Sequence, residues 1–298
     1  SNCNLNELPS SLPESLPNLT ILFLSNNRFR VMPSVIGQCL KLQMVAFKGN
    51  GMTSLHPDAL QPQLRWLILT DNQLSELPET IGRCKLLQKC MLSGNQLGCL
   101  PDSISECHNL ELIRLASNQL TELPVKLLEL PNLSWVGLSD NPFLKHVNYS
   151  TTTDIFKIIT NLNEDNHDGI ILGQGAGSET KKLFHQGKPV AVKIYNGTMT
   201  SDGIPEMERS IYRKLAQLHE SPALIQVVGE CHGTGSLVME FLDHYTALAD
   251  PPSLETCSRD VYHYDKKRLL SSTEGRHIVT VLLDALTQLH AVGICHGD

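Results

Sequence analysis

The hydrophobic positions in the first half of the chain recur at a fixed interval. An asparagine returns every 22 or 23 residues, and each one closes a block with the pattern L-x-x-L-x-L-x-x-N. Two apolar residues separated by one position predict a short strand in every block, with its leucines on one face. A single block cannot bury these leucines, so neighbouring blocks must stack and share a core. The pattern therefore predicts a solenoid, marked by Asn27, Asn50, Asn72, Asn95, Asn118 and Asn141.

Residues 3–147 are similar to leucine-rich repeat proteins, whose repeat has this spacing. A partial unit precedes the first complete one, with matching positions at Cys3, Leu5, Leu8 and Pro9. Prolines precede a short helical stretch in several units, where a missing N–H costs least; they are Pro33, Pro78, Pro101 and Pro124. We therefore expect an α/β leucine-rich repeat domain over residues 1–147.

The strand positions that point away from the solenoid core are mostly apolar. On a solvated strand these positions should be polar, and an apolar patch of this kind marks an interaction site. Both tryptophans of the chain are among them. Three interpretations stay open: a macromolecular partner, docking of the chain's own second domain, or padding of a small solenoid. The expected partner-binding residues are Phe23, Met44, Trp66, Ile68, Met91, Arg114 and Trp135.

The repeat pattern stops after Asn141. Residues 148–168 are polar apart from the apolar stretch 155–159, which predicts a linker with a short element that caps the last repeat. An apolar stretch then runs into a glycine-rich turn, and a second apolar stretch fifteen residues later ends at Lys193. Glycines let a hairpin lie close over phosphates, with N–H groups directed at the oxygens. These features predict the first three strands of a second sheet.

A helix is predicted over residues 205–215. Apolar residues recur there every four positions, and a proline stands at the start. Glu208 is the expected ion-pair partner of Lys193, and Glu206, on the same helix, is the alternative. Two further strands are expected, at 225–229 and 235–242.

The last part of the chain predicts a long polar loop and another helix. The loop covers residues 243–270. Ser271 and Glu274 have capping-box spacing, and the helix that follows carries one apolar face: Ile278, Val281, Leu282, Ala285 and Leu289. The final residues are His296-Gly297-Asp298.

Protein kinases have the same features in the same order: a glycine turn, a lysine on a strand (here Lys193), a glutamate on a helix (here Glu208), a strand that leads into the hinge (here 235–242) and a His-x-Asp motif (here 296–298). Residues 169–298 resemble the N-terminal part of that domain, and the whole chain resembles bacterial-type leucine-rich repeat protein kinases. The resemblance implies an α+β small lobe and the beginning of a large lobe. It also implies phosphoryl transfer from ATP, with Mg²⁺, to a serine or threonine hydroxyl of a protein.

The resemblance assigns a role to each matched residue. Lys193 would hold the phosphates, Glu208 would orient Lys193, and Asp298 would position the acceptor hydroxyl or accept its proton. The metal ligands would lie beyond residue 298, so the chain is expected to be an incomplete kinase that is inactive alone. The expected nucleotide contacts are Leu172, Gly173, Gly175, Gly177, Thr180, Ala191, Lys193, Met239, Glu240 and Leu242.

Two departures from the kinase pattern concern the glycine turn and the ending. Ser178 stands where the family has its third glycine, while Gly177 lies one place early. Gly297 replaces the usual arginine of the ending. A second reading of the function therefore stays open, in which the repeat domain is a protein-binding scaffold and the second domain is an inactive or nucleotide-sensing lobe.

The composition of the chain restricts the cellular compartments and the classes of partner to be expected. The net charge of −7 offers no basic face for nucleic acid or an anionic membrane. No run of 18 apolar residues or secretory leader is visible, so we expect a cytoplasmic protein. Nine cysteines occur without metal-ligand spacing. Three of them, Cys39, Cys84 and Cys107, lie twelve residues after a repeat asparagine and predict a buried ladder of thiols, with a Cys84–Cys107 redox pair as the alternative.

Overall fold

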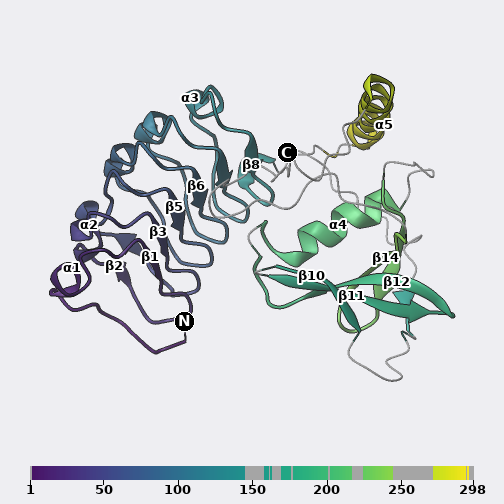
Figure 1. Ribbon diagram of the computed structural model, residues 1–298, viewed down its shortest axis with the longest axis horizontal. Coiled ribbons are helices and arrows are strands. Elements are labelled where there is room, and N and C mark those ends of the chain that lie inside the picture. The colour runs from purple at the N-terminus through teal and green to yellow at the C-terminus, as the bar shows by residue number, and fades with distance from the viewer. Residues whose placement is uncertain are drawn as a thin grey trace.

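The computed structural model describes residues 2–144, 158–160, 162, 169–175, 177–200, 202–216, 224–243, 271–292 and 294. Figure 1 shows two bodies. We call the curved one, residues 2–144, the repeat domain, and the one formed by the described residues between 158 and 243 the sheet domain. None of the described helices is long and apolar enough to cross a membrane.

The concave side of the repeat domain is a parallel sheet with one strand from each unit. Each strand pairs with the next at equivalent positions, so that Trp66 lies beside Lys89 and Met44. The sheet order is the order of the chain: β1 (Ile21–Phe23), β3 (Met44–Ala46), β5 (Trp66–Ile68), β6 (Lys89–Met91), β7 (Leu112–Arg114) and β8 (Trp135–Gly137). A second small sheet joins β2 (Val31–Met32) to β4 (Ser54–Leu55).

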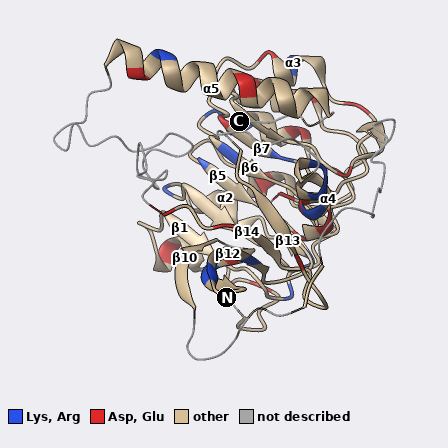
Figure 2. Cartoon of the chain, turned by 90° about the vertical axis from the view of Figure 1, so that its right-hand side faces the viewer, with Lys and Arg blue, Asp and Glu red and all other residues tan. Residues whose placement is uncertain are grey.

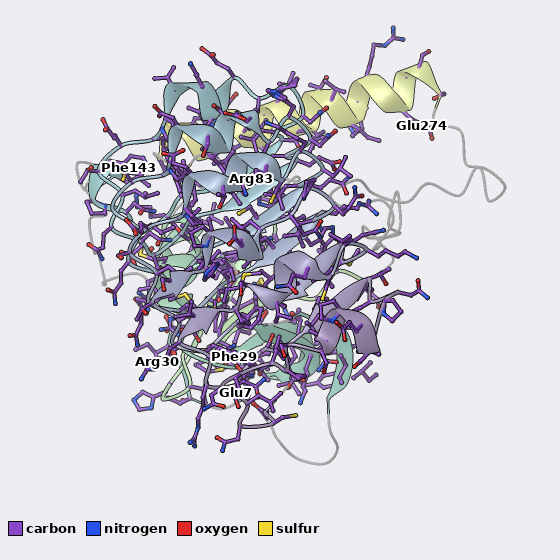
Figure 3. The ribbon with its side chains drawn as sticks, turned by 90° about the vertical axis from the view of Figure 1, so that its left-hand side faces the viewer. Glu7, Phe29, Arg30, Arg83, Phe143 and Glu274 are labelled. Carbon is purple, nitrogen blue, oxygen red and sulfur yellow. The ribbon has the colours of Figure 1, made fainter. Side chains whose placement is uncertain are left out.

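Short helical elements form the opposite side of the solenoid. They are α1 (Leu12–Ser15), α2 (Val35–Gln38), η1 (Pro57–Ala59), η2 (Glu79–Arg83), η3 (Asp102–Glu106) and α3 (Val125–Leu128). A further short helical turn, η4 (Pro142–Leu144), directly follows Asn141. The prolines fall directly before η2, η3 and α3, as expected. Between the two sides, the repeat leucines form one continuous core, and Phe29, labelled in Figure 3, packs edge-on against Phe47 within it.

The cysteine ladder lies at the ends of these helical elements. Cys39, Cys84 and Cys107 are all buried, and each N–H donates to a carbonyl three residues earlier. Burial raises the pKa of Cys84 to about 12 and that of Cys107 to about 11. These thiols therefore stay protonated at neutral pH, and every cysteine that the structure describes is free. The prediction of a buried ladder is confirmed.

Each repeat asparagine holds two units together. The side-chain amide of Asn95 donates to the carbonyl of Leu92 in its own unit, at 2.8 Å, and to that of Leu69 in the preceding unit, at 3.0 Å. Its Oδ1 atom accepts the N–H of Leu74 at 3.0 Å. Asn50, Asn72, Asn118 and Asn141 make equivalent bonds. These side chains satisfy buried backbone groups where the chain leaves the strand.

The residue before each asparagine adopts a left-handed backbone conformation. Its φ is positive in all six units: Asn26 (55°), Gly49 (66°), Asp71 (59°), Gly94 (69°), Ser117 (54°) and Asp140 (58°). Glycine, asparagine and aspartate tolerate this region best, and they hold five of the six positions. The sharp turn after the strand thus limits which residues can stand there.

The sheet domain is built around antiparallel strands. Their order is β10 (Ile170–Gln174), β11 (Ser178–His185), β12 (Lys188–Tyr195), β14 (Leu237–Glu240), β13 (Val227–Cys231) and β9 (Ile158–Ile159). Helix α4 (Pro205–Leu215) has the predicted bounds. Its neighbour β13 begins and ends two residues later than the sequence predicts. Among the described residues, its buried core cluster is small and contains Ile159, Val190, Val192 and Val238, with partly buried side chains packed against it.

The apolar part of the linker has a different place from the one expected. Ile158 and Ile159 form β9, which pairs in parallel with Glu230 and Cys231 of β13. They extend the six-stranded sheet of the sheet domain instead of capping the last repeat, because the open edge of β13 offers backbone hydrogen bonds to an extended segment. The remainder of the linker lies outside the described residues.

Helix α5 (Ser272–Ala291) begins with the predicted capping box. The Ser271 hydroxyl accepts the N–H of Glu274 at 3.2 Å, and a Glu274 carboxylate oxygen accepts the N–H of Ser271 at 2.8 Å. The expected apolar face is only partly covered, since Ala285 and Leu289 are buried while Leu282 is exposed.

Replacing Asn95 with alanine should destabilise the repeat domain by about 2–4 kcal/mol, because it removes three hydrogen bonds to buried backbone groups and leaves the N–H of Leu74 without its acceptor. The carbonyls of Leu69 and Leu92 keep the bonds from Asn72 and Asn118. Urea unfolding followed by tryptophan fluorescence measures this effect, since both tryptophans lie in the repeat domain. Asn109→Ala is the matched control: its exposed amide donates to one carbonyl, that of Lys85, and its loss should cost less than about 1 kcal/mol. Equal losses in the two variants would contradict the role of the asparagines.

Candidate functional site

The predicted lysine and glutamate of the sheet domain meet. Lys193, on β12, places its Nζ atom 2.5 Å from Oε1 of Glu208 in the first turn of α4. Strand alternation turns Lys193 toward the helix, and the helix start at Pro205 brings Glu208 to the same level. Both side chains are about one quarter exposed, at 24% and 26%. The ion pair is thus partly shielded but still open to a ligand.

Tyr195 forms one wall of this ion pair. Burial, followed by the charge of the Glu208 carboxylate, raises the pKa of Tyr195 far above its ordinary value. The Nζ atom of Lys193 lies 5.6 Å from the centre of the ring, and the guanidinium of Arg209 lies 5.8 Å from it. The phenol therefore stays neutral, and its ring separates the Lys193 pair from the next charged cluster.

That next cluster fixes α4 to β13. Glu230 accepts from the Nη2 atom of Arg213 at 2.8 Å and lies 3.6 Å from the Nε atom of Arg209. Glu206, the alternative partner for Lys193, instead pairs with these two arginines, at 2.7 Å and 2.5 Å. Glu230 is not among the site residues predicted from the sequence. The one available signal was a glutamate in an otherwise apolar strand, at Val227-Val228-Gly229-Glu230.

The glycine turn connects β10 to β11 beside the lysine strand. The N–H of Gly175 donates to the carbonyl of Ser178 at 2.8 Å, which tightens the turn. Thr180 pairs with Gly173 on one side and with Lys193 on the other. A Cβ atom on Gly173 would meet no atom within 4 Å. The space above this hairpin is open, and Leu172 is exposed at its edge.

The remaining predicted nucleotide contacts lie on the two neighbouring strands. Ala191 on β12 pairs with Met239 on β14, and both are buried. Glu240 ends β14, and its N–H donates to the carbonyl of Gln226 at 2.9 Å, so this donor is already used within the protein. Leu242 follows and is exposed.

The catalytic aspartate expected from the sequence, Asp298, lies outside the described residues. Within the part of the chain that the structure describes, no group of three or more His, Cys, Asp or Glu side chains could hold a metal ion. The described part of the candidate site is therefore the lysine–glutamate pair, the glycine turn and the two strands beside them.

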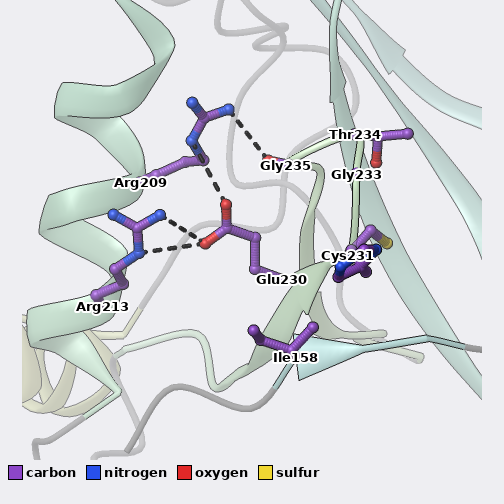
Figure 4. A pocket seen from close by; sticks show the side chains of 9 residues that line it. Ile158, Arg209, Arg213, Glu230, Cys231, Gly233, Thr234 and Gly235 are labelled. Carbon is purple, nitrogen blue, oxygen red and sulfur yellow. Dashed lines mark hydrogen bonds and ion pairs between the residues drawn. The ribbon is translucent and has the colours of Figure 1, made fainter. Parts of the chain in front are cut away.

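A separate pocket of about 490 Å³ lies on the other side of the arginine cluster (Figure 4). It is lined by Ile158, Arg209, Arg213 and residues 230–235. None of the predicted nucleotide contacts lines it. Its two arginines are paired with Glu230, which lies between them, and with Glu206 of α4.

The concave face contains two cation–aromatic contacts. The Nζ atom of Lys89 lies 4.3 Å from the centre of the Trp66 ring, and the guanidinium of Arg114 lies 4.8 Å from that of Trp135. Phe23 is exposed at the N-terminal end of the face, Met44 is buried among neighbouring side chains, and Ile68 and Met91 are partly buried. The predicted residues thus form a contiguous face, but their side chains differ in exposure to solvent.

Charges of both signs are interspersed over the molecule (Figure 2). On α4, Glu206 and Glu208 occupy the first turn, while Arg213 and Lys214 occupy the last. This order complements the helix dipole.

Replacing Glu230 with glutamine should loosen α4, because Arg209 and Arg213 lose the negative charge that holds them to β13. We expect amide hydrogen exchange in residues 205–215 to become about fivefold faster. Glu179→Gln is the control, since it removes a similar ion pair with Lys181, at 3.0 Å, on β11. Unchanged exchange in α4 of the Glu230 variant would contradict this role.

Comparison with known proteins concerns the first half of the chain. The Leucine Rich Repeat family model matches residues 18–39 and 63–84. A solved structure of a leucine-rich repeat protein from Leptospira interrogans is 35% identical, with a TM-score of 0.45, and the match covers 47% of this chain and 36% of that one. A chain of the TLR13–ssRNA13 complex is 20% identical, with a TM-score of 0.40, and the match covers 47% of this chain and 21% of that one. No curated protein matches.

This chain matches well under two thirds of the length of either solved structure. Both segments that the family model matches lie in the repeat domain, within units that share the parallel strands and the asparagine bonds. The N-terminal part of this chain is therefore a solenoid of leucine-rich repeats.

Proposed function

We propose that residues 169–298 are the N-terminal part of a protein kinase domain and that the sheet domain binds ATP with Mg²⁺. The observation that carries the proposal is the 2.5 Å contact between Lys193 on β12 and Glu208 on α4. The ion pair joins the third strand of the antiparallel sheet to the helix that follows it, which is the arrangement that the resemblance to protein kinases implies. The family comparisons bear only on the repeat domain, so the proposal rests on this geometry.

The proposed chemistry assigns each group a separate task. Glu208 holds the Lys193 ammonium toward the open side of the sheet, where its donors can meet phosphate oxygens. The glycine turn adds backbone N–H groups above the same space, and the absence of side chains at Gly173 and Gly175 leaves room for phosphates. ATP, bound with Mg²⁺, would supply the phosphoryl group that is transferred to a protein hydroxyl. By the same resemblance, Asp298 positions that hydroxyl.

The adenine would lie between the glycine hairpin and β14. Ala191 and Met239 form an apolar floor, since both are buried and directly paired. The donor of Glu240 is used by Gln226, so the adenine contacts would come from the Glu240 carbonyl and the backbone of Leu242.

Replacing Lys193 with methionine should weaken binding of MgATP at least tenfold, because the phosphates lose their cation. Fluorescence titration with a labelled ATP analogue on the full chain measures the dissociation constant. Lys188→Met is the matched control: it stands on the same strand at the exposed hairpin end and should bind like the wild type. Failure of the wild type to bind, or equal binding by the Lys193 variant, would contradict the proposal.

A second function, protein binding by the repeat domain, is favoured by the concave aromatic face. Trp66 and Phe23 give it rigid apolar area, and Lys89 adds a cation above the Trp66 ring. Aromatic anchors beside cations are typical of interaction hot spots. In this reading the repeats select a substrate or partner protein.

Replacing both Trp66 and Phe23 with alanine should abolish capture of a protein that the wild type retains in a pull-down. Leu40→Ala is the control, because Leu40 is the more exposed residue (73%, against 46% for Phe23) and follows α2 on the opposite side. The concave face is not the binding surface if the double variant captures the same protein as well as the wild type does.

A further inference from the structure

The loop between β12 and α4 docks on the repeat domain. Arg114, at the end of β7, forms an ion pair with Asp202 of this loop. The hydroxyl of Ser139, in the last repeat, donates to the carbonyl of Asp202 at 3.1 Å. One residue of the sheet domain is thus held by two successive repeat units.

Glycines allow the two domains to approach this closely. Gly203 has a φ of 113°, and a Cβ atom there would lie 3.1 Å from both the Ala116 Cβ and the Ser117 Oγ atoms. On the repeat side, a Cβ atom on Gly94 would lie 2.8 Å from the Cε atom of Met199. These distances are shorter than ordinary van der Waals contacts. The surfaces are therefore in direct contact, which an ion pair alone would not require.

Arg114 is also held from the side of the repeat domain. Its guanidinium stacks on Trp135, 4.8 Å from the ring centre, and with the loop in place its side chain is 10% exposed. A cation held in this way loses little rotamer freedom when it pairs with a carboxylate. The end of the concave face thus holds Asp202 through a stacked cation, and at this position the face is occupied by the chain's own second domain.

The opposite side of the loop touches both parts of the candidate nucleotide site. A Cβ atom on Gly177, in the glycine turn, would lie 2.9 Å from the Thr200 Cβ atom. The N–H of Asn196 donates to the carbonyl of Gly177 at 2.9 Å. Two residues after Gly203, α4 begins, with Glu208 in its first turn. A displacement of the loop would therefore move the glycine turn and Glu208 together.

The loop is also stiff, so a displacement at Asp202 moves the rest of the loop with it. The Thr200 N–H and the Thr200 hydroxyl both donate to the Gly203 carbonyl at 2.9 Å. The N–H of Asp202 donates to the Thr200 hydroxyl oxygen at 3.2 Å. With its ends closed in this way, the turn behaves as one unit.

We propose that Arg114 is a positioning residue for the Lys193–Glu208 site and acts through Asp202. The repeat domain then sets the place of the glycine turn and the start of α4. A protein that binds Arg114 and Trp135 would release the loop and weaken the nucleotide site, and by linkage the nucleotide would weaken the binding of that protein. The nucleotide effect rests on the proposed function, whereas the docking contact does not.

The first measurement concerns docking alone. On the full chain, Arg114→Gln and Asp202→Asn should each speed amide hydrogen exchange in residues 196–206 about threefold or more. The double variant should be no faster than the faster single variant, because both changes break one contact. Arg114→Lys keeps the charge but loses the planar group that stacks on Trp135, and should fall between the wild type and Arg114→Gln. Unchanged exchange in the single variants, or additive effects in the double variant, would overturn the proposal.

The second measurement concerns the nucleotide. The same single variants should bind the labelled ATP analogue with MgCl₂ about threefold to tenfold more weakly than the wild type, again without additivity in the double variant. Faster exchange with unchanged affinity would overturn the positioning role. If the wild type itself binds no nucleotide, the proposed function and the positioning role both fail, and the exchange data still decide whether the loop docks.

A variant that leaves the charges unchanged tests the docking contact independently of any misfolding of the Arg114 variants. Gly94→Asn places a side chain under Met199 and keeps the left-handed backbone, since Asn26 holds the equivalent position with a φ of 55°. It should reproduce the faster exchange and the weaker binding. Lys85→Gln breaks the exposed ion pair with Glu106, away from the docking contact, and should change neither. A Gly94 variant that behaves like the Lys85 variant would overturn the proposal.

Discussion

The repeat domain depends on the asparagine that closes each unit. Where the chain turns out of a strand, several backbone groups are buried without a strand partner, and each asparagine supplies both donors and an acceptor to them. Asn95 alone joins Leu69, Leu74 and Leu92. Because the bonds cross from one unit to the next, they also fix the spacing of the strands. The strands of the concave face, which carry Trp66 and Arg114, are regularly paired for this reason.

The sheet domain is held together in a different way. In the part of the sheet domain that the structure describes, the buried core cluster has four aliphatic side chains, and α4 is attached to β13 through Glu230 and two arginines. Ion pairs that are partly exposed contribute little individually. The place of α4, and with it the distance between Lys193 and Glu208, therefore depends more on neighbouring contacts than a helix on a large apolar core would. Docking of the Asp202 loop on the repeat domain is such a contact.

Sequence reasoning succeeded where a local pattern carries the information. Periodicity located the six strands of the repeat domain and the bounds of α4, and capping-box spacing located the start of α5. The same patterns predicted the ion pair between Lys193 and Glu208, with Glu206 as the alternative partner. It did not find Glu230, because the need for a carboxylate between Arg209 and Arg213 arises only once α4 lies against β13. The strand formed by Ile158 and Ile159 was missed for a similar reason: two apolar residues in a polar segment do not show which open edge they will join.

The repeat solenoid follows from the spacing of asparagines and leucines alone, since this spacing admits no other way to bury the leucines and satisfy the turns. The residues of the second half that could form an ion pair at a strand and a helix can also be named from local patterns. What the concave face meets, in contrast, depends on how the two domains pack. Arg114 and Asp202 are far apart in the chain and belong to different domains, and their pairing depends on Gly94 and Gly203 allowing the two surfaces to touch. Such a fit depends on the shapes of both domains, which no local pattern records.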